Sequence, residues 1–255
     1  MATKRKKKTW PPIAAAIFCI GILWFIINSL HSRMEQSGML TANQGVWVAV
    51  NYPVHGIDVS HHQSRIDWQK VSSSKVNESK IKFAFIRATN GIEKEDMYFA
   101  RNWKKCKEVG IARGAYHYFR ANENANQQAD FFIHNVQLLP GDLPPVIDVE
   151  KTYGVSQQVL LNGVTQWLKR IETHYGVTPI IYSSTGFYAH HLEGYFDKYP
   201  FWVAHYNLDT NMPRTQRGWH FWQHSETGNI PGIKGAVDFN VFNGNSQELK
   251  MLLVR

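Results

Sequence analysis

PPVIDVEKTYGVSQQVLLNGVTQWLKRIETHYGVTPIIYSS, residues 144–184, contains the repeating unit that decides the fold. Short apolar runs at 144–150 and 178–184 have the length of buried strands, and they flank a longer segment at 156–175. Apolar residues recur through that segment at helical spacing: Val159, Leu160, Val164, Trp167, Leu168 and Ile171. Gly176 follows at the position typical of a helix C-cap. We therefore predict a strand, a helix and a second strand parallel to the first, joined by a right-handed crossover.

The same alternation extends over most of the chain. Strands are predicted at eight places: 54–60, 81–89, 111–119, 144–150, 178–184, 201–206, 219–224 and 235–242. Helices are predicted after the first five strands: at 67–76, 96–109, 124–138 and 156–175, with a short one around 186–193. The segments after the sixth and seventh strands are short and rich in Pro, Gly, Asn and Thr, so they leave little room for crossover helices.

Eight strands in an α/β pattern favour a closed TIM-like barrel whose last helices are missing. The alternative is an open, doubly wound sheet. The sequence contains neither a G-x-G-x-x-G motif nor a G-x-x-x-x-G-K-S/T motif, which argues against a nucleotide-binding sheet of that kind.

Charge is distributed unevenly along the chain. The formal net charge is +8, from 28 basic and 20 acidic residues. Five basic residues stand together at 4–8 and Arg33 follows a long uncharged stretch, so residues 34–255 carry 22 basic and 20 acidic side chains. A nucleic-acid-binding domain spreads its basic excess over one face, and we therefore expect no nucleic-acid partner.

A long apolar segment follows the basic residues. Residues 13–30, IAAAIFCIGILWFIINSL, would form a helix about 27 Å long, which matches the hydrocarbon thickness of a bilayer. The preceding basic residues favour a cytoplasmic N-terminus. We predict a basic cytoplasmic tail at 1–12, a transmembrane anchor in the lipid bilayer at 13–30, a linker at 31–51 and an external domain at 52–255. A cleaved signal peptide, which would leave the domain secreted, and a buried core helix are the alternatives.

Four acidic residues fall on the predicted strands where a barrel of this type builds its active site. Asp58 ends the first strand, Asp148 and Glu150 end the fourth, and Asp238 lies on the eighth. Side chains at i and i+2 share one face of a strand, so Asp148 and Glu150 point the same way. Burial and like charge raise the pKa of at least one such carboxyl, and a protonated acid beside ionised partners suits glycosidic cleavage. The structural alternative is that these residues cap helices.

Aromatic residues are concentrated at the same strand ends. Their flat faces suit the C–H faces of sugars, and tyrosine hydroxyls can bind polar groups, so together they indicate a carbohydrate groove. These residues are Tyr116, Tyr118, Tyr182, Trp202, Tyr206 and Trp222.

The histidines do not predict a metal site. The pairs at 61–62 and 190–191 are adjacent, so on a strand their side chains would point in opposite directions. The sequence has no H-E-x-x-H motif and no H-x-H motif at a strand end. His117 and His205 are equally well explained as hydrogen-bonded core residues. A membrane-tethered metal hydrolase is therefore the weaker alternative.

The ordered set of motifs resembles the glycoside hydrolase family 25 lysozymes, the Chalaropsis-type N-acetylmuramidases. The resemblance covers about residues 55–244. The matching stretches are GIDVSHHQ (56–63), IDW (66–68), FAFIRATNG (83–91), GIARGAYHYFR (110–120), PPVIDVE (144–150), PIIYSS (179–184), FWVAHY (201–206) and FWQHSETGNIPGIKGAVDFNVFNG (221–244).

The resemblance implies a modified TIM-like barrel of five β/α units and three final strands, (β/α)5(β)3. It implies hydrolysis of the β-1,4 bond between N-acetylmuramic acid and N-acetylglucosamine in the glycan strands of peptidoglycan, without a metal or organic cofactor. The family's catalytic acid maps to Glu150, its partner aspartate to Asp148, and its other acidic site residues to Asp58 and Asp238. Its substrate positions match Tyr116, Tyr182 and Trp202, and Tyr206 and Gln223 complete the expected substrate-binding set.

The resemblance implies hydrolysis with net retention of configuration at the anomeric carbon. The expected mechanism is assistance by the 2-acetamido group of the substrate. Asp148 would orient the 2-acetamido group for attack on the anomeric carbon, while Glu150 donates a proton and later deprotonates water. A direct nucleophile and an inverting route remain open. A catalytically silent glycan-binding module is a further alternative.

Two residues depart from the family pattern, Asn90 where an acidic residue is common and His62 where an aromatic one is frequent. Both are expected to affect outer subsites. We expect a monomeric catalytic domain at the bacterial cytoplasmic membrane, facing away from the cytoplasm.

Overall fold

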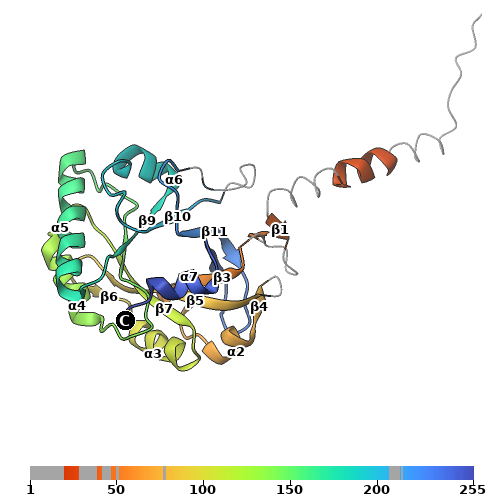
Figure 1. The fold of residues 1–255 in the computed structure, drawn as a ribbon, viewed down its shortest axis with the longest axis horizontal. Coiled ribbons are helices and arrows are strands. Elements are labelled where there is room, and N and C mark those ends of the chain that lie inside the picture. The colour runs from red at the N-terminus through yellow and green to blue at the C-terminus, as the bar shows by residue number, and fades with distance from the viewer. Residues whose placement is uncertain are drawn as a thin grey trace, which may run out of the picture.

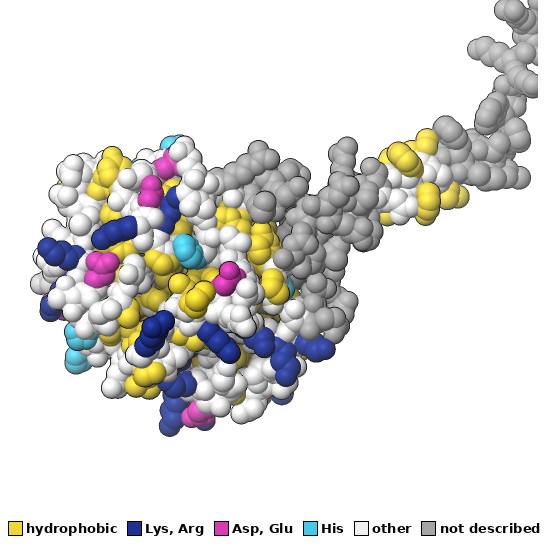
Figure 2. All heavy atoms as spheres, in the orientation of Figure 1, with side chains coloured by type: hydrophobic (Ala, Val, Ile, Leu, Met, Phe, Trp, Pro, Cys, Tyr) yellow, Lys and Arg dark blue, Asp and Glu magenta, His cyan; other side chains and the backbone are white. Residues whose placement is uncertain are grey.

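A computed structural model describes residues 20–28, 39–41, 47–49, 52–76, 79–206, 213 and 215–255. Residues 20–28 are helical, and their bulky apolar side chains are exposed, as the yellow side chains on this segment show (Figure 2). The rest of the predicted anchor at 13–30, and the whole tail at 1–12, lie outside the described residues. Within the described residues, no helix is long and apolar enough to cross a bilayer.

The predicted linker at 31–51 contains two short strands, β1 (Met39–Thr41) and β2 (Trp47–Ala49), which pair antiparallel. Ala49 is buried, and β2 contacts the barrel strand β11 (Phe221–Gly228). The described part of this segment is therefore joined to the barrel by contacts.

Eight strands form a closed barrel (Figure 1). The first seven run parallel, and β12 runs antiparallel between β11 and β3, while β3 also pairs with β5. This closure confirms the predicted barrel and excludes the open sheet. The barrel strands are β3 (Val54–Val59), β5 (Ser79–Asn90), β7 (Ala112–Tyr118), β8 (Val146–Asp148), β9 (Ile180–Ser184), β10 (Phe201–Ala204), β11 and β12 (Val237–Phe242).

Helices follow the first five strands, as predicted, and lie outside the barrel (Figure 1). Ser156 caps the longest of them by accepting a hydrogen bond from the Val159 amide, and Gly176 ends it in the left-handed conformation. The helices are α2 (Trp68–Ser73), α3 (Phe99–Glu108), α4 (Ala125–Asn135), α5 (Gln157–Tyr175) and α6 (Thr185–Phe187), which continues as a π-helix over Tyr188–Leu192.

Four short elements differ from the prediction. The predicted helix at 67–76 ends at Ser73, because Ser74 is extended and β4 (Lys75–Val76) pairs with the start of β5. β6 (Lys94–Glu95) pairs with the other end of β5. A 3-10 turn at His61–Gln63 follows β3. The helix α7 (Ser246–Leu252), which was not predicted, contributes Leu249 to the apolar cluster inside the barrel.

Two glycines create space for the aromatic side chains inside the barrel. Gly56 lies beside Phe83 in the pairing of β3 with β5, and Gly114 lies beside Phe85 in the pairing of β5 with β7. A Cβ at Gly56 would lie 2.4 Å from the Phe83 ring, and one at Gly114 would lie 2.5 Å from the Phe85 ring. Both rings are fully buried, so neither has room to move away.

We predict that Gly56→Ala destabilises the fold. Alanine has the better strand conformational entropy by about 0.5–1 kcal/mol, but overpacking costs about 1–3 kcal/mol, so the clash dominates. Thermal unfolding should show a melting temperature several degrees lower. Gly186→Ala is the matched control, because no atom lies within 4 Å of its added Cβ and its φ is not positive. An unchanged melting temperature in Gly56→Ala would contradict this packing argument.

Candidate active site

A cavity of about 230 Å³ opens at one end of the barrel. It is lined by all nine side chains that the family resemblance implies for catalysis or substrate binding, and their individual roles stay predictions. Its lining includes Asp58, Ser60, His62, Arg87, Tyr116, Tyr118, Asp148, Glu150, Tyr182, Trp202, Tyr206, Gln223, Glu226 and Asp238.

Strand direction explains how the acidic residues meet. β3 and β8 belong to the parallel part of the barrel, so Asp58 and Asp148 lie near their C-terminal ends at the same rim. β12 runs antiparallel, so its N-terminal end reaches this rim, and Asp238 is paired with Asp58 in the strand register. The rule that site residues follow the C-terminal ends of strands therefore does not apply to the eighth strand.

Asp148 is the last residue of β8 and Glu150 lies two residues beyond it. Both line the cavity. Val149 lies between them and points into the outer apolar core, as the i, i+2 argument predicts. Asp148 is only 6% exposed, and no described residue makes a hydrogen bond to its Oδ1 atom. This carboxyl therefore has a buried oxygen without a partner among the described residues, which is uncommon in folded proteins.

The pKa values of both carboxyls are raised. Burial raises the pKa of Asp148 well above its ordinary value, and the charges of Glu150 and Asp58 raise it further. Burial also raises the pKa of Glu150, while hydrogen bonds with Tyr118 and Tyr182 oppose that rise. The cavity thus favours the protonated form of a carboxyl of the Asp148 and Glu150 pair. A protonated carboxyl can donate its proton to the oxygen of a leaving group.

Asp58 is held by two carboxamides. Gln223 Nε2 and Asn240 Nδ2 each donate to Asp58 Oδ2 at 2.7 Å. Burial raises the pKa of Asp58 to about 6, although both hydrogen bonds oppose the rise. Burial, the charge of Asp58 and a hydrogen bond with it raise the pKa of Asp238 to about 9. Asn240 was not predicted, and the signal available was its position two residues after Asp238, on the same strand face.

Aromatic side chains form the floor and rim of the cavity. Trp202 is stacked on Phe85 with ring centroids 4.4 Å apart, and Tyr182 packs against Trp202 at the same separation. Tyr206 is 43% exposed and offers the most accessible ring. Trp222 does not line the cavity, contrary to the prediction. Its neighbours on β11, Phe221 and Gln223, face into the barrel, so Trp222 faces outward. Its ring packs in the apolar core between the strands and the helices, and its indole N–H donates to the His205 carbonyl.

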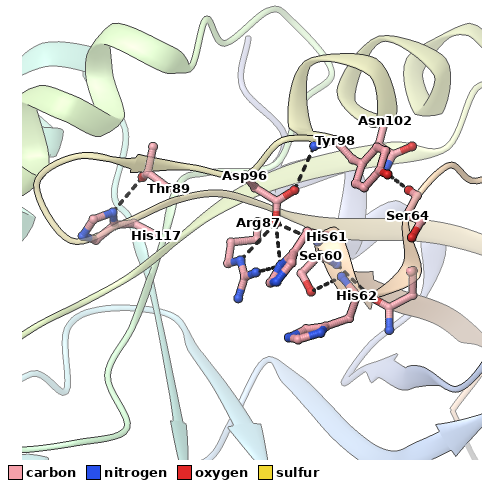
Figure 3. A network of polar contacts seen from close by, with 11 residues as sticks. Ser60, His61, His62, Ser64, Arg87, Thr89, Asp96, Tyr98, Asn102 and His117 are labelled. Atoms are coloured by element: carbon pink, nitrogen blue, oxygen red, sulfur yellow. Dashed lines mark hydrogen bonds and ion pairs between the residues drawn. The ribbon is translucent and has the colours of Figure 1, made fainter.

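Arg87 brings a positive charge to the cavity and was not predicted. Figure 3 shows it beside Asp96, whose Oδ2 accepts a hydrogen bond from Arg87 Nε at 3.1 Å and from the His61 amide at 2.7 Å. Arg87 also contacts His61 Nδ1. The alternation of Phe83, Phe85 and Arg87 along β5 was the available signal, since all three face inward.

The remaining sequence candidates have structural partners. His117 is buried between Thr89 Oγ1 at 2.7 Å and Gln128 Oε1 at 3.0 Å, as expected of a hydrogen-bonded core residue. Asn90, outside the cavity lining, accepts a hydrogen bond from Arg120 Nε at 2.8 Å, whereas His62 lines the cavity. In the part of the chain that the structure describes, no three His, Cys, Asp or Glu side chains are grouped to hold a metal ion.

Known proteins share both the sequence and the fold. The model of the glycosyl hydrolases family 25 matches residues 57–233. The chain is 47% identical over 203 residues to protein YegX of Escherichia coli strain K12, which covers 80% of this chain and 74% of that protein. It is 34% identical over 213 residues to lysozyme M1 of Streptomyces globisporus, which covers 78% of this chain and 71% of that protein.

A solved family 25 glycosyl hydrolase from Bacillus anthracis has a TM-score of 0.72 and 29% identity, over 80% of this chain and 95% of that one. This likeness agrees with the closed barrel. The chain belongs to the glycosyl hydrolases family 25 and is a glycosidase.

Proposed function

We propose that this glycosidase is a muramidase that hydrolyses peptidoglycan at the β-1,4 bond between N-acetylmuramic acid and N-acetylglucosamine. The similarity to lysozyme M1 supports the choice of substrate. The glycan strand binds across the cavity, and Tyr116, Tyr182, Trp202, Tyr206 and Gln223 contact its sugars.

The observation that carries this proposal is the pairing of Asp148 and Glu150 on one face of the cavity. Glu150 has a raised pKa and two phenol partners, which suits a general acid that protonates the leaving oxygen. Asp148 Oδ1 has no hydrogen-bond partner among the described residues. We assign this carboxyl, which lines the cavity, to accept from the N–H of the 2-acetamido group. Holding that amide turns its carbonyl toward the anomeric carbon.

The reaction then proceeds in two steps. Glu150 donates its proton to the leaving oxygen while the acetamido carbonyl attacks the anomeric carbon. Glu150, now ionised, removes a proton from water that attacks the same carbon and restores the acetamido group. Asp58 and Asp238 complete the acidic lining, and the ionised member of this pair stabilises positive charge at the sugar. This assignment of roles extends the family membership to named residues.

We also propose that residues 13–30 anchor the enzyme in the cytoplasmic membrane, with the barrel outside the cytoplasm. The support is the uncharged run of residues 9–32 beside the basic residues at 4–8. Cleavage of the segment would instead release the enzyme. Fractionation of cells into membrane and soluble parts, followed by mass determination of the enzyme, distinguishes the two.

We predict that Glu150→Gln folds normally but lowers turnover by about 10²–10⁴-fold, because glutamine cannot transfer a proton. The measurement is the release of new reducing ends from purified peptidoglycan. Glu226→Gln is the matched control, since Glu226 lines the same cavity but is exposed, and its turnover should stay within a few fold of the original. If the unaltered enzyme binds peptidoglycan without releasing reducing ends, the silent binding module is the correct interpretation.

The activity should have a bell-shaped pH profile. Asp58, with a pKa of about 6, must be ionised, so kcat/KM falls as the pH drops through about 6. Glu150 must be protonated, so activity is also lost on the alkaline side, where Glu150 ionises. Because the pKa of Glu150 is raised, this loss occurs at a higher pH than it would for an ordinary glutamate. Initial rates on soluble glycan strands across the pH range test this. A profile that keeps rising below pH 5 contradicts the requirement for ionised Asp58.

Substrate assistance predicts retention of configuration, because two inversions occur at the anomeric carbon. NMR of the first product from a defined glycan oligomer should show the β anomer before mutarotation. An α anomer as the first product would eliminate the assisted route and leave an inverting mechanism.

A further inference from the structure

The oxygen atom Oδ2 of Asp58 accepts two hydrogen bonds from buried amides. The donors are Asn240 Nδ2 and Gln223 Nε2, each at 2.7 Å. Asn240 is completely buried and Gln223 is 3% exposed, so both amides are shielded from solvent. An oxygen that receives two N–H donors at this distance has no free lone pair direction for a proton of its own.

The orientation of the Asn240 amide follows from a neighbour that can only donate. Trp202 Nε1 lies 2.7 Å from Asn240 Oδ1, and an indole nitrogen is never an acceptor. The carbonyl oxygen of Asn240 must therefore face the indole, and its NH₂ group must face Asp58. The indole N–H of Trp202 thus fixes the Asn240 amide in the orientation that donates to the Asp58 carboxyl.

Gln223 is oriented in the same sense. The hydroxyls of Tyr182, at 2.7 Å, and of Tyr206 both donate to Gln223 Oε1. Its NH₂ group is left to face Asp58. Two independent chains of hydrogen bonds, one from an indole and one from two phenols, thus end on the same oxygen of Asp58.

We propose that Asn240 and Gln223 are positioning residues that hold Asp58 as the anionic member of the Asp58–Asp238 pair, so that the proton which the pair shares is carried by Asp238. Asp58 and Asp238 occupy paired positions on β3 and β12, which in an antiparallel sheet brings their Cβ atoms to within about 4.5–5.5 Å. Two carboxyls that close do not both ionise at neutral pH. The two amides decide which one does.

Other acidic residues face both members of the pair. Glu150 repels both carboxyls, Asp148 repels Asp58, and Glu226 repels Asp238. The Tyr206 hydroxyl lies close to both. Arg87 lines the same cavity but is paired with Asp96. Asp238, which has no amide donor comparable to those of Asp58, is the member that keeps the proton, in agreement with pKa values of about 6 for Asp58 and about 9 for Asp238.

The consequence for the reaction rests on the proposed function. At neutral pH this side of the cavity presents one fixed negative charge, on Asp58, and one O–H donor, on Asp238. The anion can stabilise positive charge on the sugar, and the donor can bind a sugar oxygen. Neither of them needs to exchange a proton during turnover.

The test is a pH titration of the full-length protein with ¹³C-labelled aspartate carboxyls, followed by NMR with both residues assigned. Asp58 should titrate near pH 6 and Asp238 near pH 9. Because no substrate is present, this result is independent of whether the enzyme is a muramidase. Ionisation of Asp238 before Asp58, or ionisation of both below pH 7, would overturn the proposal.

Trp202→Phe tests the role of the amide orientation. Without the indole N–H, the Asn240 amide is free to turn its oxygen toward Asp58, so the Asp58 midpoint should rise by about one pH unit, equivalent to a tenfold change in proton affinity. Trp68→Phe is the matched control, because Trp68 Nε1 also donates to an asparagine, Asn102 Oδ1 at 3.3 Å, away from the cavity. Equal midpoints in the two variants would overturn the positioning role, and the titration order in the unaltered protein remains decisive if Trp202→Phe does not fold.

Discussion

The antiparallel pairing of β12 with β3 closes the barrel and builds the site in one step. Its register places Asp238 opposite Asp58, Asn240 opposite Gly56 and Phe242 opposite Val54. Residues two apart share a strand face, so all three point into the barrel. Asp238 lines the cavity, Asn240 bonds Asp58, and Phe242 joins the apolar interior below. A slip of one residue would turn all three outward, so the same constraint specifies closure, core and acidic site.

The apolar interior beneath the site sets the electrostatics of the carboxyls. Phe83, Phe85 and Phe221 pack edge to face below the cavity, and Phe85 stacks on Trp202. This environment raises the folded-state pKa of Asp58 to about 6 and of Asp238 to about 9. Raised values mean that the two groups favour the folded state below their unfolded pKa near 4, and that this contribution is lost as the pH rises through about 6 and then 9. The rest of the barrel therefore has to stabilise a site that opposes folding at neutral pH.

Sequence patterns were sufficient to predict the helices, the strands and the strand faces, because these depend on local periodicity. Five helices, eight strands and the shared face of Asp148 and Glu150 follow from spacing alone, and the cavity contains the nine expected side chains. Patterns were insufficient where long-range pairing decides. The reversed direction of β12 and the outward turn of Trp222 depend on the register of neighbouring strands. Asn240 was missed because its importance arises from Asp58, which is distant in sequence but adjacent in the barrel.

The hydrogen-bond partners distinguish two kinds of carboxyl in the site. One kind can gain and lose a proton, and the other is held in its ionised form. Glu150 has the phenol of Tyr118 as a partner, and this O–H can rotate to serve as donor or acceptor, so it accommodates both protonation states of Glu150. Asp58 has two oriented amides, whose NH₂ groups only donate, so they favour its ionised form over its neutral form. A general acid that must release and regain a proton in each cycle requires the first kind of environment, whereas a charge that stabilises the reacting sugar throughout requires the second. The partners therefore give a reason, independent of the family resemblance, for assigning proton transfer to Glu150 and electrostatic stabilisation to Asp58.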